Sequence, residues 1–257
     1  MIQAVLTPAA GKRLIARAVV SLPVIQTALQ SGTIVVVAGT TNGYVAEELL
    51  ALCAHGAKFS RERFFRGITL PPGAHKTTAA GRLADDGGFP GDVVIRKGAW
   101  LEGATIFDVI DDLAQGDVIL KGANAVDLAQ RLAAVLIGDP KGGTLLAALQ
   151  AVVGRRVRLI LPVGLEKRVS TDLVSLARRL NAPGAHGARL MPVAGDVVTE
   201  IDALEILTGA KAELMAAGGV CGAEGTVWLA VFGTPEQEKA AKAILAGVMG
   251  EAPFTLS

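Results

Sequence analysis

The segment from Ile34 to Leu50, IVVVAGTTNGYVAEELL, decides the fold class. Its four leading apolar residues predict a short buried strand, and the apolar spacing after Tyr44 predicts a helix. Between strand and helix, Gly39 and Gly43 permit a tight turn and the close approach of a ligand. A strand, a glycine-rich loop and a helix in this order are typical of α/β proteins, whose ligands bind beyond the ends of parallel strands.

The loop GTTNG also has the chemistry of an anion site. Thr40, Thr41 and Asn42 offer side-chain donors, and the free N–H groups of a helix N-terminus favour negative charge, so phosphate is the natural ligand. The loop has neither the Gly-Lys-Ser/Thr ending of a Walker A motif nor the spacing of a dinucleotide-binding fingerprint. A structural interpretation stays open, in which Thr or Asn caps the helix and the glycines form the turn.

The alternation of strands and helices continues to about residue 194. Such alternation predicts a parallel, mostly buried sheet. Thr7 followed by Pro8 is typical of a helix start. We expect helices at residues 7–30, 44–54, 105–114, 144–153 and 170–180, and strands at residues 33–38, 64–70, 92–96, 117–121, 133–137, 157–162 and 189–193.

The pattern changes after about residue 195. We expect a helix at 199–207, with Glu200 and Asp202 in its acid-favouring first turn, then strands at 212–219 and 226–233 and a helix at 235–248. The chain therefore divides into an α/β phosphate-ligand-binding domain, residues 1–194, and a small α+β domain, residues 195–257. The segment from Pro71 to Gly91 has no clear pattern, and a loop of that length is typical of a lid, a binding loop or a surface insertion.

The composition narrows the classes of partner. The chain is 51% hydrophobic with a mean hydropathy of +0.47, which supports a sizeable core, and its net charge of +1 points to neither nucleic acid nor a membrane surface. No apolar run approaches the roughly 20 residues of a membrane span. The three histidines are unclustered and the two cysteines far apart, so we expect no metal, no cofactor and a cytoplasmic location. A homo-oligomer stays open.

Polar residues follow three further predicted elements, in the segments KGANAVD (121–127), PKGGT (140–144) and GLEK (164–167). If these segments lie at one edge of a parallel sheet, they converge on the loop GTTNG. Local roles stay open, with Asn124 bonded within a turn, Asp127 solvated, and Glu166 and Lys167 capping a helix. We assign phosphate binding to Gly39, Thr40, Thr41, Asn42, Gly43, Lys121, Lys141, Gly142 and Gly143, other substrate contacts to Gly122, Asn124 and Lys167, and proton transfer to Asp127 or Glu166.

These segments carry a resemblance to a known superfamily. VAGTTNGYVAEELL resembles the phosphate-binding loop shared by ribose-5-phosphate isomerases, sugar-phosphate-sensing repressor domains, methylthioribose-1-phosphate isomerases and CoA transferases. GANAVD is similar to the GAD-E-V-D segment of the isomerases, PKGGTLL to their lysine- and glycine-rich loop, and RLILPVGLEKRV to a strand of the repressor sensors that ends near a lysine. The resemblance implies a three-layer open parallel sheet and a small phosphorylated metabolite, such as a sugar phosphate, as ligand.

The sequence departs from the isomerase pattern at the positions of two acids. Lys121 and Asn124 stand where carboxylates are expected, and no glutamate follows the glycine-rich loop at 142–143. An ammonium and an amide cannot act as those carboxylates. Three functions therefore stay open: an aldose–ketose isomerase that uses Asp127 or Glu166, a non-catalytic sensor or scaffold, and an acyl or CoA transferase with Glu166 as its nucleophile.

Overall fold

A computed structural model describes residues 1–54, 56–67, 69 and 91–255. Within these ranges the fold is mixed α/β, as predicted, around a central sheet of six strands. In spatial order the strands are β10 (Asp196–Val198), β8 (Arg158–Pro162), β5 (Val118–Leu120), β2 (Thr33–Val36), β3 (Val93–Arg96) and β4 (Ala99–Trp100). The prediction of a wholly parallel sheet is wrong, because β3 and β4 form an antiparallel edge beside β2. Lys97 and Gly98, both with positive φ, form the tight turn that reverses the chain between them.

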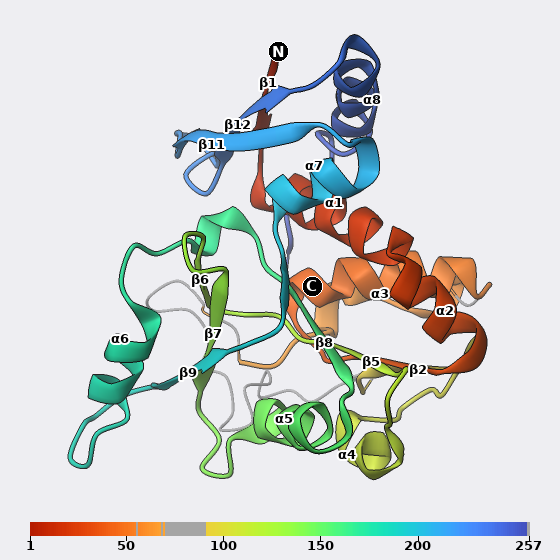
Figure 1. Ribbon diagram of the computed structural model, residues 1–257, viewed down its shortest axis with the longest axis vertical. Coiled ribbons are helices and arrows are strands. Elements are labelled where there is room, and N and C mark those ends of the chain that lie inside the picture. The colour runs from red at the N-terminus through yellow and green to blue at the C-terminus, as the bar shows by residue number, and fades with distance from the viewer. Residues whose placement is uncertain (55, 68, 70–90, 256–257) are drawn as a thin grey trace.

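Helices cover both faces of the central sheet (Figure 1). Ile34 and Val36 pack in one core with α1 (Pro8–Ser21) and α3 (Thr40–Leu52). Val35 and Val37 pack in a second core with α5 (Gly143–Arg155) and the short α4 (Ile106–Val109). Burial on both faces explains why the strand residues form a continuous apolar run rather than an alternating one.

The helix expected over residues 7–30 is two helices. Thr7 caps α1 as predicted, and its side chain accepts a hydrogen bond from the N–H of Ala10 at 3.2 Å. Pro23, which lacks an N–H group, ends the first helix and begins α2 (Pro23–Ser31) at an angle of 63°. Among the described residues, no single helix is long and apolar enough to cross a membrane, although this bent pair meets the criterion by length and composition.

Two of the expected strands lie outside the central sheet. β7 (Leu132–Ile137) pairs with β6 (Ala125–Asp127) and β9 (Arg189–Val193) in an antiparallel sheet that α6 (Leu173–Leu180) covers. The strand expected at 64–70 is also wrong, since residues 64–67 form no strand; residues 68 and 70 lie outside the described ranges. Residues 71–90 of the patternless segment that ends at Gly91 are likewise outside them.

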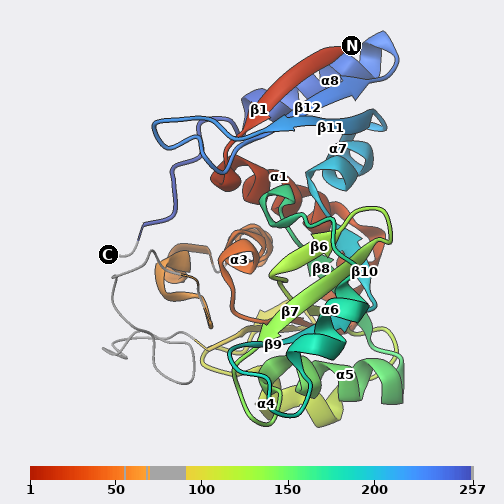
Figure 2. The same cartoon turned by 90° about the vertical axis from the view of Figure 1, so that its left-hand side faces the viewer.

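A third sheet joins the two ends of the chain (Figure 2). The expected hairpin is present as β11 (Lys211–Ala217) and β12 (Val227–Phe232), with helices α7 (Glu200–Thr208) and α8 (Pro235–Ala246). β12 also pairs with β1 (Ile2–Leu6), a strand that the sequence analysis did not identify. Two strands therefore pair across the predicted boundary between residues 194 and 195. β1, from before the boundary, joins this sheet, and β10, from after it, joins the central sheet.

Candidate functional site

The C-terminal ends of β2, β5 and β8 lie side by side, because these neighbouring strands are parallel. Asp92 lies at the same edge, since β3 runs in the opposite direction and begins there. Its buried carboxylate accepts hydrogen bonds from the N–H groups of Ala38 (2.9 Å) and Ile106 (2.8 Å), and Arg66 Nη2 donates to both oxygens at 3.4 Å. Asp92 therefore holds the segment that follows β2 in place. It can do so because β3 is antiparallel to β2 and begins at this edge of the sheet.

The GTTNG segment is the first turn of α3 and not a separate loop, because α3 begins at Thr40 instead of the expected Tyr44. Asn42 is fully buried, and its Nδ2 donates to the carbonyl oxygens of Val37 (2.7 Å) and Leu120 (2.9 Å). Asn42 thus joins the ends of β2 and β5, and the capping role expected of Thr or Asn in the structural interpretation is wrong, since Gly39 is the N-cap and no described side chain caps this helix start. Thr41 Oγ1 and Asn42 Oδ1 are buried without a hydrogen-bond partner within the described residues.

Gly39 and Gly43 serve the same turn in different ways. Gly39 is the N-cap of α3 in an extended conformation. Gly43 lies against Arg61, whose Cβ would be 2.9 Å from a Cβ added at position 43. A side chain here would have to displace the segment that carries Arg61, so close packing explains this glycine without a ligand.

Three lysines gather beyond the strand ends. Lys121 follows β5, Lys167 ends the short 3-10 helix η4 (Leu165–Lys167) after β8, and Lys12 lies in α1. Burial lowers the pKa of Lys121 to about 8, Asp92 opposes the shift, and the charges of Lys167 and Arg66 add to it. The pKa of Lys167 is lowered by burial and by Lys12, against the effect of Glu166 and Glu200.

The three ammonium groups have no carboxylate partner in the part of the chain that the structure describes. Within the described part of the chain, neither Lys12, Lys121 nor Lys167 forms an ion pair. Lys167 Nζ donates to a neutral group, the carbonyl oxygen of Ala123, at 2.9 Å. The region beyond the ends of β2, β5 and β8, which we call the lysine crevice, therefore has positive charge that the described carboxylates do not pair with.

Two glutamates accompany the lysines. Glu166 lies in η4 beside Lys167, with its carboxylate folded over Gly164. Glu200, at the start of α7, is 1% exposed, and its Oε2 accepts from the N–H of Leu165 at 2.9 Å. Burial, and then the charge of Glu166, raise the pKa of Glu200 to about 8. Sequence analysis identified Glu200 only as a first-turn acid, because its contact with η4 depends on how α7 packs.

Asp127 and Asn124 have local roles in the β6–β7 hairpin. Asp127 Oδ1 accepts from the N–H groups of Ala129 (2.9 Å) and Gln130 (3.2 Å), which stabilises the turn between the strands. Asn124 Oδ1 accepts from the N–H of Leu136 at 3.0 Å. The expected proton-transfer role of Asp127 thus competes with a turn-capping role that occupies one of its oxygens.

The structure does not join the segment PKGGT to the lysine crevice by any contact among the described residues. Lys141 is exposed, and its N–H donates to Asp139 Oδ1 at 2.6 Å. Gly142 and Gly143 have positive φ and lead into α5, below β7 in Figure 1. The prediction of convergence assumed that β7 is a strand of the parallel sheet, whereas β7 belongs to the antiparallel sheet.

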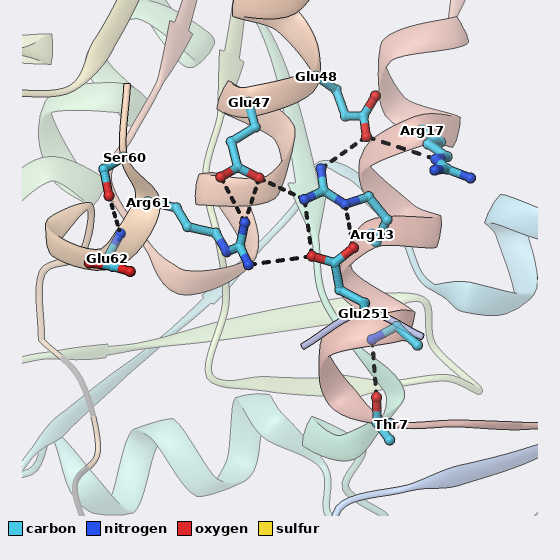
Figure 3. Close-up of polar contacts among 10 residues, drawn as sticks. Thr7, Arg13, Arg17, Glu47, Glu48, Ser60, Arg61, Glu62 and Glu251 are labelled. Atoms are coloured by element: carbon cyan, nitrogen blue, oxygen red, sulfur yellow. Dashed lines mark hydrogen bonds and ion pairs between the residues drawn. The ribbon is translucent and has the colours of Figure 1, made fainter. Parts of the chain in front are cut away.

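A second charged cluster connects α1 and α3 with Arg61 and Glu251 (Figure 3). Glu251 binds Arg13 (2.9 Å) and Arg61 (3.3 Å), and Glu47 binds the same two arginines at 2.6 and 2.7 Å. Both guanidinium groups also lie over the ring of Tyr44, at 4.8 and 4.5 Å from its centroid. This cluster holds the C-terminal segment against the body of the protein, and its charges are paired, unlike those of the lysine crevice.

An open cavity of about 180 Å³ lies beside this paired cluster, between Phe59, Arg61 and Phe254. It contains none of the lysines, so its presence says nothing about the lysine crevice. Within the described ranges, no group of three or more His, Cys, Asp or Glu side chains is arranged to hold a metal ion. Comparisons with protein-family models, curated proteins and solved structures find no match to this chain.

Proposed function

We propose that this protein binds a small phosphorylated metabolite, with a sugar phosphate as the best candidate, in the lysine crevice. The observation that carries the proposal is the gathering of Lys12, Lys121 and Lys167, none of which has a carboxylate partner among the described residues. Burial and the nearby positive charges lower the pKa of Lys121 and of Lys167, which disfavours the charged form of each. A phosphate dianion among them would remove the repulsion, and would form strong charge-assisted hydrogen bonds.

The start of α3 supports the same ligand. Its free N–H groups and its dipole favour an anion, and Asn42 connects this helix start to Leu120, the residue before Lys121. Thr41 contributes a buried hydroxyl that has no other partner within the described residues. These groups add neutral donors to the three lysines, which is the usual composition of a phosphate site.

For catalysis we propose an aldose–ketose isomerisation in which Glu166 transfers the proton. Glu166 lies beside Lys167 and is half-buried, so its carboxylate is near the proposed anion. Glu200 acts as a positioning residue, because its hydrogen bond to Leu165 holds the segment that carries Glu166 and Lys167. Asp127 is the weaker candidate, because it already accepts two hydrogen bonds in its turn.

A non-catalytic sensor is the second candidate. The observation that favours it is the local use of Asn124 and Asp127 in the β6–β7 hairpin, together with Lys121 and Asn124 at the positions where the isomerases are expected to carry acids. Incubation with ribose 5-phosphate, followed by proton NMR, separates the two candidates. A ketose product supports the isomerase, and tight binding without turnover supports the sensor.

We also propose that the fold is that of the isomerase and CoA-transferase superfamily. Support comes from the parallel order β10-β8-β5-β2 and from the helices on both faces. The antiparallel edge β3–β4 and the separate β6-β7-β9 sheet are additions to the arrangement that the sequence resemblance implies.

Thermal unfolding with a panel of ligands tests the binding proposal. Ribose 5-phosphate at 100 times its dissociation constant should stabilise the protein by about 2.7 kcal/mol, whereas ribose at the same concentration should have no effect. Lys167→Met should abolish most of this shift, because it removes one of the three cations. Lys141→Met is the matched control, since Lys141 is exposed and makes no contact with the crevice.

Two results would contradict the proposal. The first is the absence of stabilisation by every phosphorylated compound in the panel. The second is an equal loss of stabilisation in both lysine variants, which would indicate a general effect of surface charge instead of a specific site.

A further inference from the structure

Lys121 differs from the other lysine that follows a strand end. Lys167 Nζ is held by the carbonyl oxygen of Ala123, and the charges of Glu166 and Glu200 favour its ammonium form. Lys121 Nζ has no hydrogen bond or ion pair with any described residue. Its amine is therefore free to turn toward a ligand, while that of Lys167 is fixed by the protein.

The surroundings of Lys121 favour the neutral amine. Asp92 supports the charged form, but burial and the positive charges of Lys167 and Arg66 outweigh it, and the pKa is about 8. At neutral pH roughly a tenth of such a lysine is the nucleophilic free amine, about 300 times the fraction of a lysine with the usual pKa. Burial and a neighbouring cation are the conditions that activate lysines for attack on carbonyl groups.

We propose that Lys121 is a nucleophile that forms a Schiff base with the carbonyl carbon of a phosphorylated aldose or ketose in the lysine crevice. This inference rests on the proposed function, because the phosphate group would bring the carbonyl carbon to the amine. Lys121 lies beyond β5, the strand between β2 and β8, and so is flanked by the start of α3 on one side and by η4 on the other.

The reaction balances without an added reagent. The lone pair of Nζ forms a bond to the carbonyl carbon, and the π electrons of the C=O bond move to oxygen. The carbinolamine then loses that oxygen as water, which takes both amine protons, and a C=N bond remains. Protonation of this imine makes it an electron sink that acidifies the adjacent C–H bond.

Glu166 is the group that would accept the proton from this C–H bond, as in the proposed isomerisation. The Schiff base also gives a reason for the residue type at position 121. A lysine stands where the isomerases are expected to have an acid, and imine formation activates the carbonyl compound by a route that does not need that acid.

Reductive trapping tests the inference. The protein is incubated at neutral pH with glyceraldehyde 3-phosphate and cyanoborohydride, and peptide mass spectrometry measures adducts at Lys121 and at exposed Lys141. We expect labelling of Lys121 to exceed that of Lys141 at least about tenfold, because the pKa of Lys121 is lowered and the phosphate group brings the carbonyl carbon to its amine. Glycerol 3-phosphate, which has the phosphate but no carbonyl, should slow the labelling of Lys121 and leave Lys141 unchanged.

Lys121→Arg provides the matched variant, because it keeps a cation but removes the nucleophile. It should lose the preferential adduct, while the labelling of Lys141 stays as in the wild-type protein. The ratio of labelling at Lys121 to labelling at Lys141 is measured in the wild-type protein, so a folding defect of Lys121→Arg would not prevent the test.

The outcomes separate the two proposals. Stabilisation by glycerol 3-phosphate with equal labelling of Lys121 and Lys141 would overturn the nucleophile and leave the phosphate site. Preferential labelling of Lys121 by glyceraldehyde 3-phosphate that glycerol 3-phosphate does not slow, together with no stabilisation by any phosphorylated compound, would support a reactive lysine and overturn the proposed function. The absence of both effects would overturn both proposals.

Discussion

Glu200→Gln should flatten the dependence of stability on pH. Glu200 is buried, and its pKa is raised from the usual 4.5 to about 8, first by desolvation and then by the charge of Glu166. The native state therefore binds this proton more tightly than the unfolded state. Between these two pKa values the native state carries more protons, so the free energy of unfolding must fall as the pH rises.

The magnitude follows from the two pKa values. A raised acid contributes its full stabilisation below the unfolded pKa and loses it as the pH passes the folded one. For a shift from 4.5 to about 8, the loss between about pH 5 and pH 8 is on the order of 3 to 4 kcal/mol. Glutamine stays neutral and its side-chain oxygen can still accept from the N–H of Leu165, so the variant should not show this loss.

Urea unfolding at a series of pH values across this window measures the effect. We expect the two proteins to have similar stability near pH 5, and the Gln variant to be the more stable one near pH 8. Glu213→Gln, at an exposed position on β11, should leave the profile of the wild-type protein unchanged. Parallel curves for wild type and Glu200→Gln would refute the reasoning, because they would mean that Glu200 titrates alike in both states.

Three further substitutions test contacts described above by the same urea assay. Gly11→Ala should lower the free energy of unfolding by about 1–3 kcal/mol, because the new Cβ at position 11 would be 2.3 Å from Glu200 Oε1. Alanine usually favours a helix, so a gain in stability would contradict this packing. Thr41→Val should stabilise the ligand-free protein by about 1 kcal/mol, because it removes a buried hydroxyl without a described partner, and should weaken phosphate binding. Glu251→Gln should lower the free energy of unfolding by about 2 kcal/mol, because Glu251 binds Arg13 and Arg61. It should also make the C-terminal segment more sensitive to proteases, and unchanged proteolysis would contradict this role.

Local patterns predicted the elements that local interactions determine. The strand after Gly32, the cap at Thr7 and the β11–β12 hairpin are visible in the sequence because each depends on residues close together in the chain. β1 was missed, because a five-residue segment becomes a strand here through its pairing with β12. The antiparallel direction of β3 was missed for a similar reason, since hydrophobic periodicity contains no information about strand direction.

The residues of the candidate site likewise include some that local sequence patterns predict and others that only the packing of the chain brings together. Lys121 and Lys167 were identified because each follows a predicted strand of the parallel sheet. Lys12 and Glu200 come from helices that pack across the chain, and no local pattern places either beside η4. Lys141 was assigned on the assumption that β7 belongs to the same sheet, and a strand's apolar pattern does not say which sheet it joins.

The pairing of β1 with β12 has a consequence for the order in which the chain folds. Leu6 pairs with Val227, which lies 227 − 6 = 221 positions later. At a synthesis rate of about 5–20 residues per second, β1 waits roughly 11 to 44 seconds for its partner to be made. During that interval the apolar side chains of Ile2, Ala4 and Leu6 have no sheet to enter, so the nascent chain must keep this strand from pairing elsewhere until β12 is made.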